Sequence, residues 1–297
     1  MSDRRVIIVG AGIIGASIAW HLAEAGYPVL VLESSDPGLG VTSGAIGWLN
    51  SANGPDPAAR KRRAEALTHW KREPFCDFVA WCGALRDQPV PGSKRCEPPS
   101  GLDLAGPVWT SPQDGMIDPV VVTRSLLERP EIEIRQTLVT TVGAHWAQTE
   151  RRLTAHAVVV AAGLGSLDLL PELPIRSGPV LSLSFGKQSA CLTQIVHGWG
   201  VELYQRSTAE LVGVAELGSD PLRIRRAAEK VLGTSLPTPR VQRWDRPMTE
   251  DAMPVLCCRP EGVFVAVGHP GLILAPMIGQ KMARLIARRS IPATKAL

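Results

Sequence analysis

The sequence predicts an α/β fold in which α/β segments at both ends of the chain bracket a β-rich middle. Two observations predict it. Near the start, the apolar run 5–9 meets glycines, and then Ile14, Ile18 and Leu22 follow at the spacing of one helix face. Near the end, the β-rich run 262–267 also meets glycines and leads into a closing helix. We therefore expect one discontinuous domain with a second domain inserted in it.

The segments between the two ends set the expected domain limits. With 297 residues, the chain is long enough for two domains. Patterning predicts helices over about 57–81, with Pro74 kinking or splitting the helix, and over 118–127 and 220–232. It predicts strands near 132–142, 153–160, 180–185, 200–205 and 210–215. The expected first domain comprises 1–86, 115–175 and 246–297, and the expected second domain comprises 87–114 and 176–245.

Composition excludes several classes of protein. Apolar residues make up 45% and charged residues 20% of the chain, which is typical of a globular protein. The net charge of +4 and the single basic run 60–63 do not predict a nucleic-acid partner. The six cysteines form no C-x-x-C pair and no zinc-ligand spacing, so we expect no metal and reduced thiols in a cytoplasmic protein. The apolar stretch 6–23 carries glycines and His21, so no transmembrane segment and no signal peptide are expected.

The first motif is Gly10-x-Gly12-x-x-Gly15, placed between a strand and a helix. In such a motif the first glycine makes a tight turn, the second admits a pyrophosphate, and the third allows close helix packing. Ile13 and Ile14 open the helix, whose N-terminus attracts negative charge. Glu33 follows the next strand, where an acid binds ribose hydroxyls and repels the 2′-phosphate of NADP. The motif predicts a dinucleotide, without distinguishing FAD from NAD; an unliganded glycine-rich turn is the alternative.

Three further segments are rich in small residues that offer backbone donors to a cofactor. A loop follows the acid-bearing strand, a buried strand ends in small residues, and a glycine turn precedes the closing helix, whose N-terminus suits a reduced flavin. The candidate cofactor residues in these segments are Ser34, Thr42, Ser43, Gly44 and Ala45; Ala161, Ala162 and Gly163; and Gly268, His269, Pro270, Gly271, Leu272, Ile273 and Leu274.

The chain resembles the D-amino-acid oxidase superfamily, and most closely its glycine oxidase and D-amino-acid dehydrogenase branch. The similar segments run nearly end to end: VIIVGAGIIGASIAWHLAEAG, TSGAIGWLN, DGMIDPVVVTRSLL, AVVVAAG, RPMTEDAMPVL and GHPGLILAPMIG. The resemblance implies a Rossmann-like FAD-binding domain and an inserted α+β substrate domain built on an antiparallel sheet. It implies oxidation of the C–N bond of a glycine-, D-amino-acid- or sarcosine-like substrate by hydride transfer to flavin N5. The loop lacks a His, and the C-terminal turn lacks a Cys, so the FAD is expected to be noncovalent.

The resemblance also implies candidate substrate residues. The family's carboxylate-binding arginine corresponds to Arg246, in the segment RPMTED. Where glycine oxidases carry a tyrosine, this chain has Glu202, and Tyr204 lies two residues on, expected on the same strand face. Tyr204 is a candidate replacement for the missing phenol. Glu202 either favours a cationic substrate group or points to solvent.

The chain is also shorter than its relatives, and we place the losses mainly within 55–155. A second interpretation of the chain's function therefore stays open. The chain is then a flavin-binding subunit of a hetero-oligomeric dehydrogenase, or a degenerate flavoprotein without activity of its own. Whether the protein is a homo- or hetero-oligomer stays open. An aromatic hydroxylase is disfavoured, because the G-D motif typical of that class is absent before the last helix. An NAD dehydrogenase would be colourless when purified.

Overall fold

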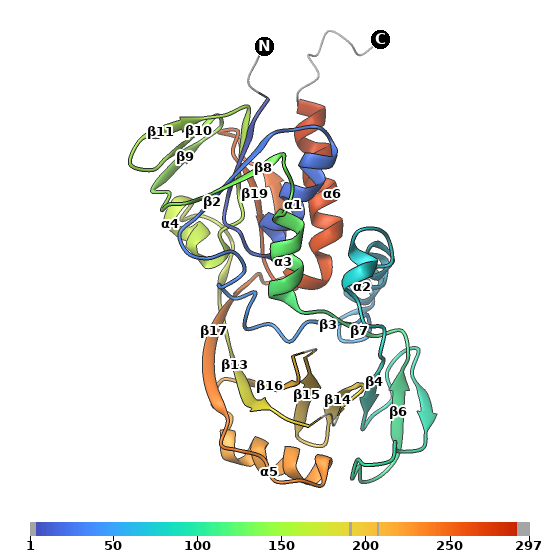
Figure 1. Ribbon diagram of the computed structural model, residues 1–297. Coiled ribbons are helices and arrows are strands. Elements are labelled where there is room, and N and C mark those ends of the chain that lie inside the picture. The colour runs from blue at the N-terminus through green and yellow to red at the C-terminus, as the bar shows by residue number, and fades with distance from the viewer. Residues whose placement is uncertain (1–3, 190–191, 207, 290–297) are drawn as a thin grey trace. The chain divides into compact units, whose positions relative to one another are not determined.

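A computed structural model describes residues 4–189, 192–206 and 208–289. The chain divides into two compact units (Figure 1). Unit 1 comprises Met1–Ser43, Pro119–Gly178 and Arg246–Leu297, and unit 2 comprises Gly44–Asp118 and Pro179–Asp245.

Unit 1 is built on a six-stranded sheet with the order β18-β19-β12-β1-β2-β8. Neighbours from β19 to β8 pair in parallel, and only β18 pairs antiparallel with β19. The central strands are buried on both faces, as continuous Val, Ile and Leu runs predict. The strands are β1 (Val6–Val9), β2 (Val29–Glu33), β8 (Ile132–Gln136), β12 (Ala157–Val160), β18 (Val255–Cys258) and β19 (Phe264–Val267).

Helices and a small sheet cover the two faces of the unit 1 sheet. Helices α1 (Ile13–Glu24), α3 (Pro119–Leu127) and α6 (Gly271–Arg289) lie on one face (Figure 1). A three-stranded sheet packs on the other through Val142, Ala147 and Leu153, which contact the β1 and β2 side chains. Its strands are β9 (Thr141–Gly143), β10 (Trp146–Gln148) and β11 (Arg152–Thr154); η2 (Gly163–Gly165) and α4 (Ser166–Leu169) follow β12.

Unit 2 is built on an eight-stranded sheet with the order β17-β13-β16-β15-β14-β4-β6-β5. The pairs from β13 to β14 are antiparallel, whereas β14 and β4 pair in parallel. One face packs on helix α5 through Leu203, Phe185 and Val231. The strands are β4 (Ala84–Arg86), β5 (Lys94–Cys96), β6 (Val108–Ser111), β13 (Arg176–Lys187), β14 (Ile195–Gly198), β15 (Val201–Gln205), β16 (Glu210–Glu216) and β17 (Arg240–Met248).

Among the described residues of unit 2, the other elements are helices α2 and α5, the 3-10 turn η1 and the strand pair β3 and β7. Helix α5 (Pro221–Leu232) begins at Asp220, whose side chain accepts from the Leu222 N–H, and ends at Gly233 with φ +61°. Helix α2 (Pro57–Trp70) ends before Pro74, and η1 (Phe75–Phe78) follows it, so the segment expected over 57–81 is split near Pro74 and ends earlier than expected. β3 (Trp48–Leu49) pairs with β7 (Gly115–Met116).

The observed division places residues 44–86 and 115–118 with unit 2, whereas we expected them in the first domain. The reason is pairing between strands that are distant in the chain. β4 lies between β14 and β6 in the large sheet, and β3 pairs with β7. Neither partner strand can be identified from the local pattern of 44–86. Within the described residues, no helix is long and apolar enough to cross a membrane.

Candidate cofactor and substrate sites

The β1–α1 turn requires glycine at two positions. Gly10 has φ +105°, and a Cβ there would lie 2.6 Å from the Ala161 carbonyl oxygen. A Cβ on Gly15 would overlap the Gly10 carbonyl oxygen. The turn is therefore tight and lies against the carboxyl end of β12, as expected for the first and third glycines of the fingerprint.

Gly12 and Thr42 lie together at the N-terminus of α1. The Ile13 N–H donates to the Thr42 Oγ1 at 3.2 Å, and a Cβ on Gly12 would lie 3.2 Å from the same hydroxyl. The first turn of α1 carries no acidic side chain. The partial positive charge of the helix N-terminus is thus not neutralised by the helix itself, which suits an anionic group.

Glu33 lies at the end of β2 with its carboxylate against the same turn. Its Oε2 accepts from the Ala11 N–H at 2.7 Å. Its Oε1 accepts from the Ser35 N–H at 3.0 Å and from the Ser34 hydroxyl at 3.2 Å. These donors hold the acid beside the fingerprint, where it can accept from ribose hydroxyls.

The start of α6 lies beside the start of α1. A Cβ on Gly271 would lie 2.7 Å from the Ile14 Cδ1 atom, and the Ser17 hydroxyl donates to the Ala275 carbonyl at 2.7 Å. Because β19, β12, β1 and β2 are parallel, their carboxyl ends share one sheet edge. The structure thus brings together the fingerprint, Glu33, Ala161 and the first turn of α6, which includes Leu272, Ile273 and Leu274.

The glycine turn before α6 is shaped by its neighbours. Gly268 has φ +141°, and a Cβ there would lie 2.6 Å from the Pro254 Cα atom. His269 is half-buried in this turn, and Pro270 accepts from the Leu274 N–H at 3.3 Å. These contacts are a structural reason for the residues found in this turn, apart from any contact with a cofactor.

The other predicted cofactor residues divide between the two units. Gly163, with φ +59°, begins η2 next to Ala162. The Ser43 hydroxyl donates to the Gly40 carbonyl at 2.9 Å in the loop after β2. Gly44 and Ala45 fall in unit 2, where a Cβ on Gly44 would overlap the Trp244 ring. Packing against Trp244 is thus a reason for glycine at position 44 that sequence reasoning missed.

The arrangement in unit 1 fits a dinucleotide. A Cβ at Gly10, Gly12 or Gly15 would intrude on the turn, an unneutralised helix N-terminus faces the sheet edge, and an acid stands at the end of the second strand. These are the features that bind pyrophosphate and ribose. The start of α6 offers further backbone donors beside them. FAD fits this donor set, since it carries both groups.

Unit 2 holds the other two predicted substrate residues, Glu202 and Tyr204, both on β15. Glu202 lies directly opposite His197 in the strand register, and its Oε2 is 3.3 Å from the His197 Nδ1 in an ion-pair contact. The Glu202 side chain is 26% exposed. Tyr204 is 1% exposed, and its hydroxyl accepts from the Arg206 Nε at 3.0 Å. Burial raises the pKa of Tyr204 to about 12, so the phenol stays protonated.

Next to this pair lies a buried cluster that sequence reasoning missed. Arg86 donates to Asp114, Asn53 and Ser111, each at 2.9 Å. Arg86 and Asp114 are 2% and 0% exposed. Trp48 lies against the Arg86 guanidinium and donates its indole N–H to Asp114 at 3.0 Å. Burial raises the pKa of the Asp114 carboxyl, and the Arg86 charge opposes that rise.

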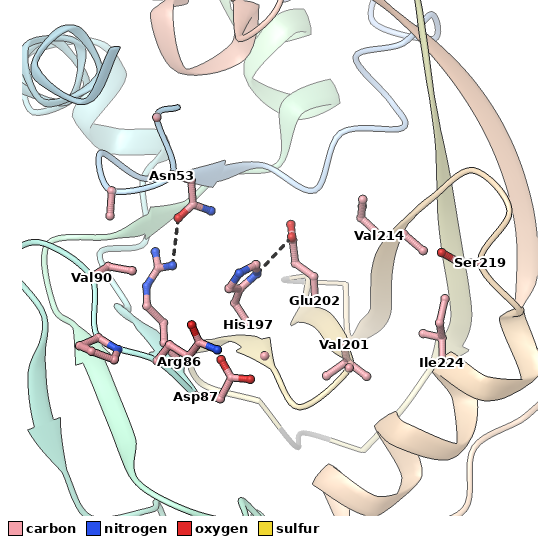
Figure 2. A pocket seen from close by; sticks show the side chains of 17 residues that line it. Asn53, Arg86, Asp87, Val90, His197, Val201, Glu202, Val214, Ser219 and Ile224 are labelled. Atoms are coloured by element: carbon pink, nitrogen blue, oxygen red, sulfur yellow. Dashed lines mark hydrogen bonds and ion pairs between the residues drawn. The ribbon is translucent and has the colours of Figure 1, made fainter. Parts of the chain in front are cut away.

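A cavity of about 660 Å³ opens onto these residues and is lined entirely by unit 2. In Figure 2 the side chains of His197 and Glu202 point toward one another, with Asn53 and Arg86 on one side and Val214 on the other. The lining combines charged groups with apolar ones. The ionisable side chains are Arg86, Asp87, His197 and Glu202, and the apolar ones include Val90, Val201, Val214 and Ile224.

Arg246, the predicted carboxylate ligand, lies in the last part of β17, which runs from unit 2 into unit 1 at this residue. Its side chain is half-buried, and its Nε donates to the Gly178 carbonyl at 3.4 Å. Of the three predicted substrate residues, Arg246 therefore belongs to unit 1, whereas Glu202 and Tyr204 belong to unit 2. No local pattern marks Arg86 or Asp114, because their partners come from other strands.

Comparison with known proteins gives a family match over nearly the whole chain. A family model described as DAO, FAD dependent oxidoreductase, matches residues 5–86 and 80–285. A glycine oxidase of Bacillus licheniformis is 26% identical over 346 aligned positions, covering 94% of this chain and 92% of the relative. Since the alignment is longer than this chain of 297 residues, the relative carries residues that have no counterpart here.

Solved structures share the fold. A glycine oxidase from Bacillus cereus has a TM-score of 0.79 and 19% identity, with 97% of this chain and 96% of that chain covered. An iminodiacetate oxidase from a Chelativorans strain has a TM-score of 0.77 and 18% identity, with 97% of each chain covered. The fold of this chain is thus shared with these two oxidases.

Proposed function

Because this chain belongs to the DAO family of FAD-dependent oxidoreductases, we propose that it oxidises the C–N bond of a small amino acid or amine to an imine. One observation carries the proposal: the β1–α1 turn, Glu33 and the start of α6 meet at one edge of the unit 1 sheet. The names of similar proteins, glycine oxidase and iminodiacetate oxidase, support the substrate class.

The residues that would hold FAD follow from this arrangement. Gly12 and the N-terminus of α1 would face the pyrophosphate, and Glu33 would accept from the ribose hydroxyls. Backbone donors at the start of α6, from Gly271 to Leu274, would stabilise negative charge on the reduced ring. Bound FAD supplies the acceptor for a hydride from the substrate carbon.

The chain's own task is then to bind and orient the substrate. Arg246 would hold the substrate carboxylate through two parallel N–H donors, because a guanidinium matches a carboxylate in this geometry. Such a grip fixes the adjacent Cα–H for transfer as a hydride from the neutral amine, whose ammonium proton has first been lost to solvent. The released imine hydrolyses in water to an oxo acid and ammonia, or to an amine where the nitrogen was substituted.

The flavin spectrum tests the proposal directly. We would purify the yellow protein and add glycine, sarcosine, D-proline and a panel of D-amino acids and amines without oxygen. Bleaching of the flavin by one of them is expected, and it identifies the substrate class. A stable yellow protein that no amine or amino acid bleaches would contradict the proposal. That outcome would favour a flavin-binding subunit or a degenerate flavoprotein, a reading that the short chain supports.

The role of Arg246 has its own test. Replacing Arg246 with Ala should weaken binding of a bleaching amino acid by about 2–5 kcal/mol, since the carboxylate loses its charged partner. Affinity for an amine without a carboxylate should not change. Arg243→Ala is the matched control, because Arg243 lies on the same strand and is 55% exposed. Equal amino-acid affinity in the Arg246 and Arg243 variants would remove Arg246 from this role.

A further inference from the structure

The cavity in unit 2 contains one positive guanidinium, but its charge is already balanced. Arg86 forms a 2.9 Å ion pair with Asp114, and both side chains are at most 2% exposed. Arg86 also donates hydrogen bonds to the Ser111 hydroxyl and to the Asn53 Oδ1, each at 2.9 Å. A guanidinium paired in this way adds little net positive charge to the cavity.

Two carboxylates line the cavity, Asp87 and Glu202, and their negative charges are neutralised less completely than the positive charge of Arg86. Glu202 has His197 as its partner at 3.3 Å, and a histidine is charged only when it is protonated. Asp87 accepts from the Trp199 N–H at 2.9 Å, a neutral backbone donor. The cavity therefore has a net negative charge, although an arginine lies in its wall.

The rest of the lining is apolar enough to hold a hydrocarbon stem. Val201 and Ile224 belong to the core that packs α5 on the sheet, and Val214 and Ala215 come from the adjacent strand. Val90 lines the opposite side (Figure 2). Cavities of this kind use apolar walls for affinity and a few polar groups for orientation.

We infer that this cavity binds a positively charged group of the substrate, an ammonium or guanidinium carried on an aliphatic stem, with Glu202 as its counter-ion. The inference rests on the proposed function and narrows its substrate class to amines and amino acids with a second cationic group. The Glu202 carboxylate would exchange its contact with His197 for one with the ligand. Asp87 adds negative charge to the cavity.

Matched pairs of compounds test the inference on the holoenzyme. D-lysine is compared with D-norleucine, and 1,5-diaminopentane with pentylamine, because each pair differs in one terminal ammonium group. Anaerobic flavin bleaching identifies the compounds that reduce the flavin, and initial rates with an electron-accepting dye give kcat/KM for each of them. Calorimetry on the anaerobically reduced holoenzyme gives the affinity for 1,5-diaminopentane without turnover. In the wild type we expect the cationic member of each pair to be preferred by about tenfold, equivalent to about 1.4 kcal/mol.

Two variants identify the residue responsible. Glu202→Gln keeps the shape of the side chain, and it should remove the preference and weaken calorimetric binding of 1,5-diaminopentane about tenfold. Glu97→Gln removes the same charge from an exposed site of unit 2 beyond β5, and it should change neither readout.

The outcomes separate this inference from the proposed function. Equal kcat/KM within each pair, or equal 1,5-diaminopentane affinity for Glu202→Gln and the wild type, overturns the cation site. Bleaching by neutral amino acids without preference overturns the cation site and leaves amine oxidation standing. Calorimetric binding that requires Glu202, with no bleaching by any compound, supports the cation site and overturns the proposed oxidation. If Glu202→Gln fails to fold, the matched pairs in the wild type still decide.

Discussion

Arg86 and Arg243 each form a 2.9 Å ion pair with an aspartate of unit 2, yet their surroundings differ. Arg86 and Asp114 are almost completely buried, whereas Arg243 and Asp245 are 55% and 36% exposed. Solvent screens the exposed pair and competes for its hydrogen bonds, so such pairs contribute little. In the buried pair, the loss of one partner leaves a charge without compensation in a poorly solvated site.

Replacing Arg86 with Met should lower the free energy of unfolding by about 3–5 kcal/mol, because Asp114 stays buried without its partner. Arg243→Met is the matched control, with an expected loss of about 0–1 kcal/mol. Urea denaturation at neutral pH measures both. Similar losses in the two variants would show that burial does not govern the contribution of the Arg86 pair.

Helices α1 and α6 approach closely because residue 279 is a glycine. A Cβ on Gly279 would lie 2.5 Å from the Ser17 hydroxyl oxygen and 2.6 Å from the Ser17 carbonyl oxygen. The Ser17 hydroxyl in turn donates to the Ala275 carbonyl, and the His21 Nδ1 lies 2.8 Å from the Ser17 carbonyl oxygen. This contact also sets the position of the α6 N-terminus beside the fingerprint.

Gly279→Ala should destabilise the protein, opposite to the usual effect in a helix. Alanine in a helix interior ordinarily gains roughly 0.5–1 kcal/mol over glycine. Here the added methyl group meets backbone of α1, and overpacking of this kind costs about 1–3 kcal/mol. Lys281→Ala, at an exposed site of the same helix, should change stability by less than about 0.5 kcal/mol. The midpoints of urea denaturation measure the stability of both variants. A Gly279→Ala variant more stable than the wild type would contradict the close packing of α1 and α6.

At the scale of the whole molecule, the cofactor should stabilise the folded chain by mass action. FAD at about 100 times its Kd should add about 2.7 kcal/mol to the unfolding free energy of the apoprotein. Riboflavin is the control, because it has the isoalloxazine ring but neither pyrophosphate nor adenosine. If the fingerprint and Glu33 carry the affinity, riboflavin at the same concentration should leave Tm almost unchanged. Equal Tm shifts for FAD and riboflavin would contradict that role.

The unit 1 fold could be predicted from the sequence because its signals are local. The strand, the glycine turn, the first helix and Glu33 all fall within the first 33 residues, and each has its own spacing rule. The family match confirms the α/β fold and the FAD-dependent class. The unit to which residues 44–86 belong could not be predicted in this way. Their strands pair with distant partners, and β14, which pairs with β4, lies more than a hundred residues away.

The sequence by itself determined that this protein has a dinucleotide-binding α/β domain, since that information lies in short-range glycine and apolar spacing. The FAD-dependent class came from the resemblance to a family and not from spacing. Only the tertiary structure decided the surroundings of Glu202. The register of β14 and β15 places it opposite His197, and the pairing of β4 with β14 and β6 places Arg86 near them. The Asp114 partner that balances the Arg86 charge comes from yet another segment. A net charge inside a cavity depends on which distant groups pair, and no local pattern carries that information.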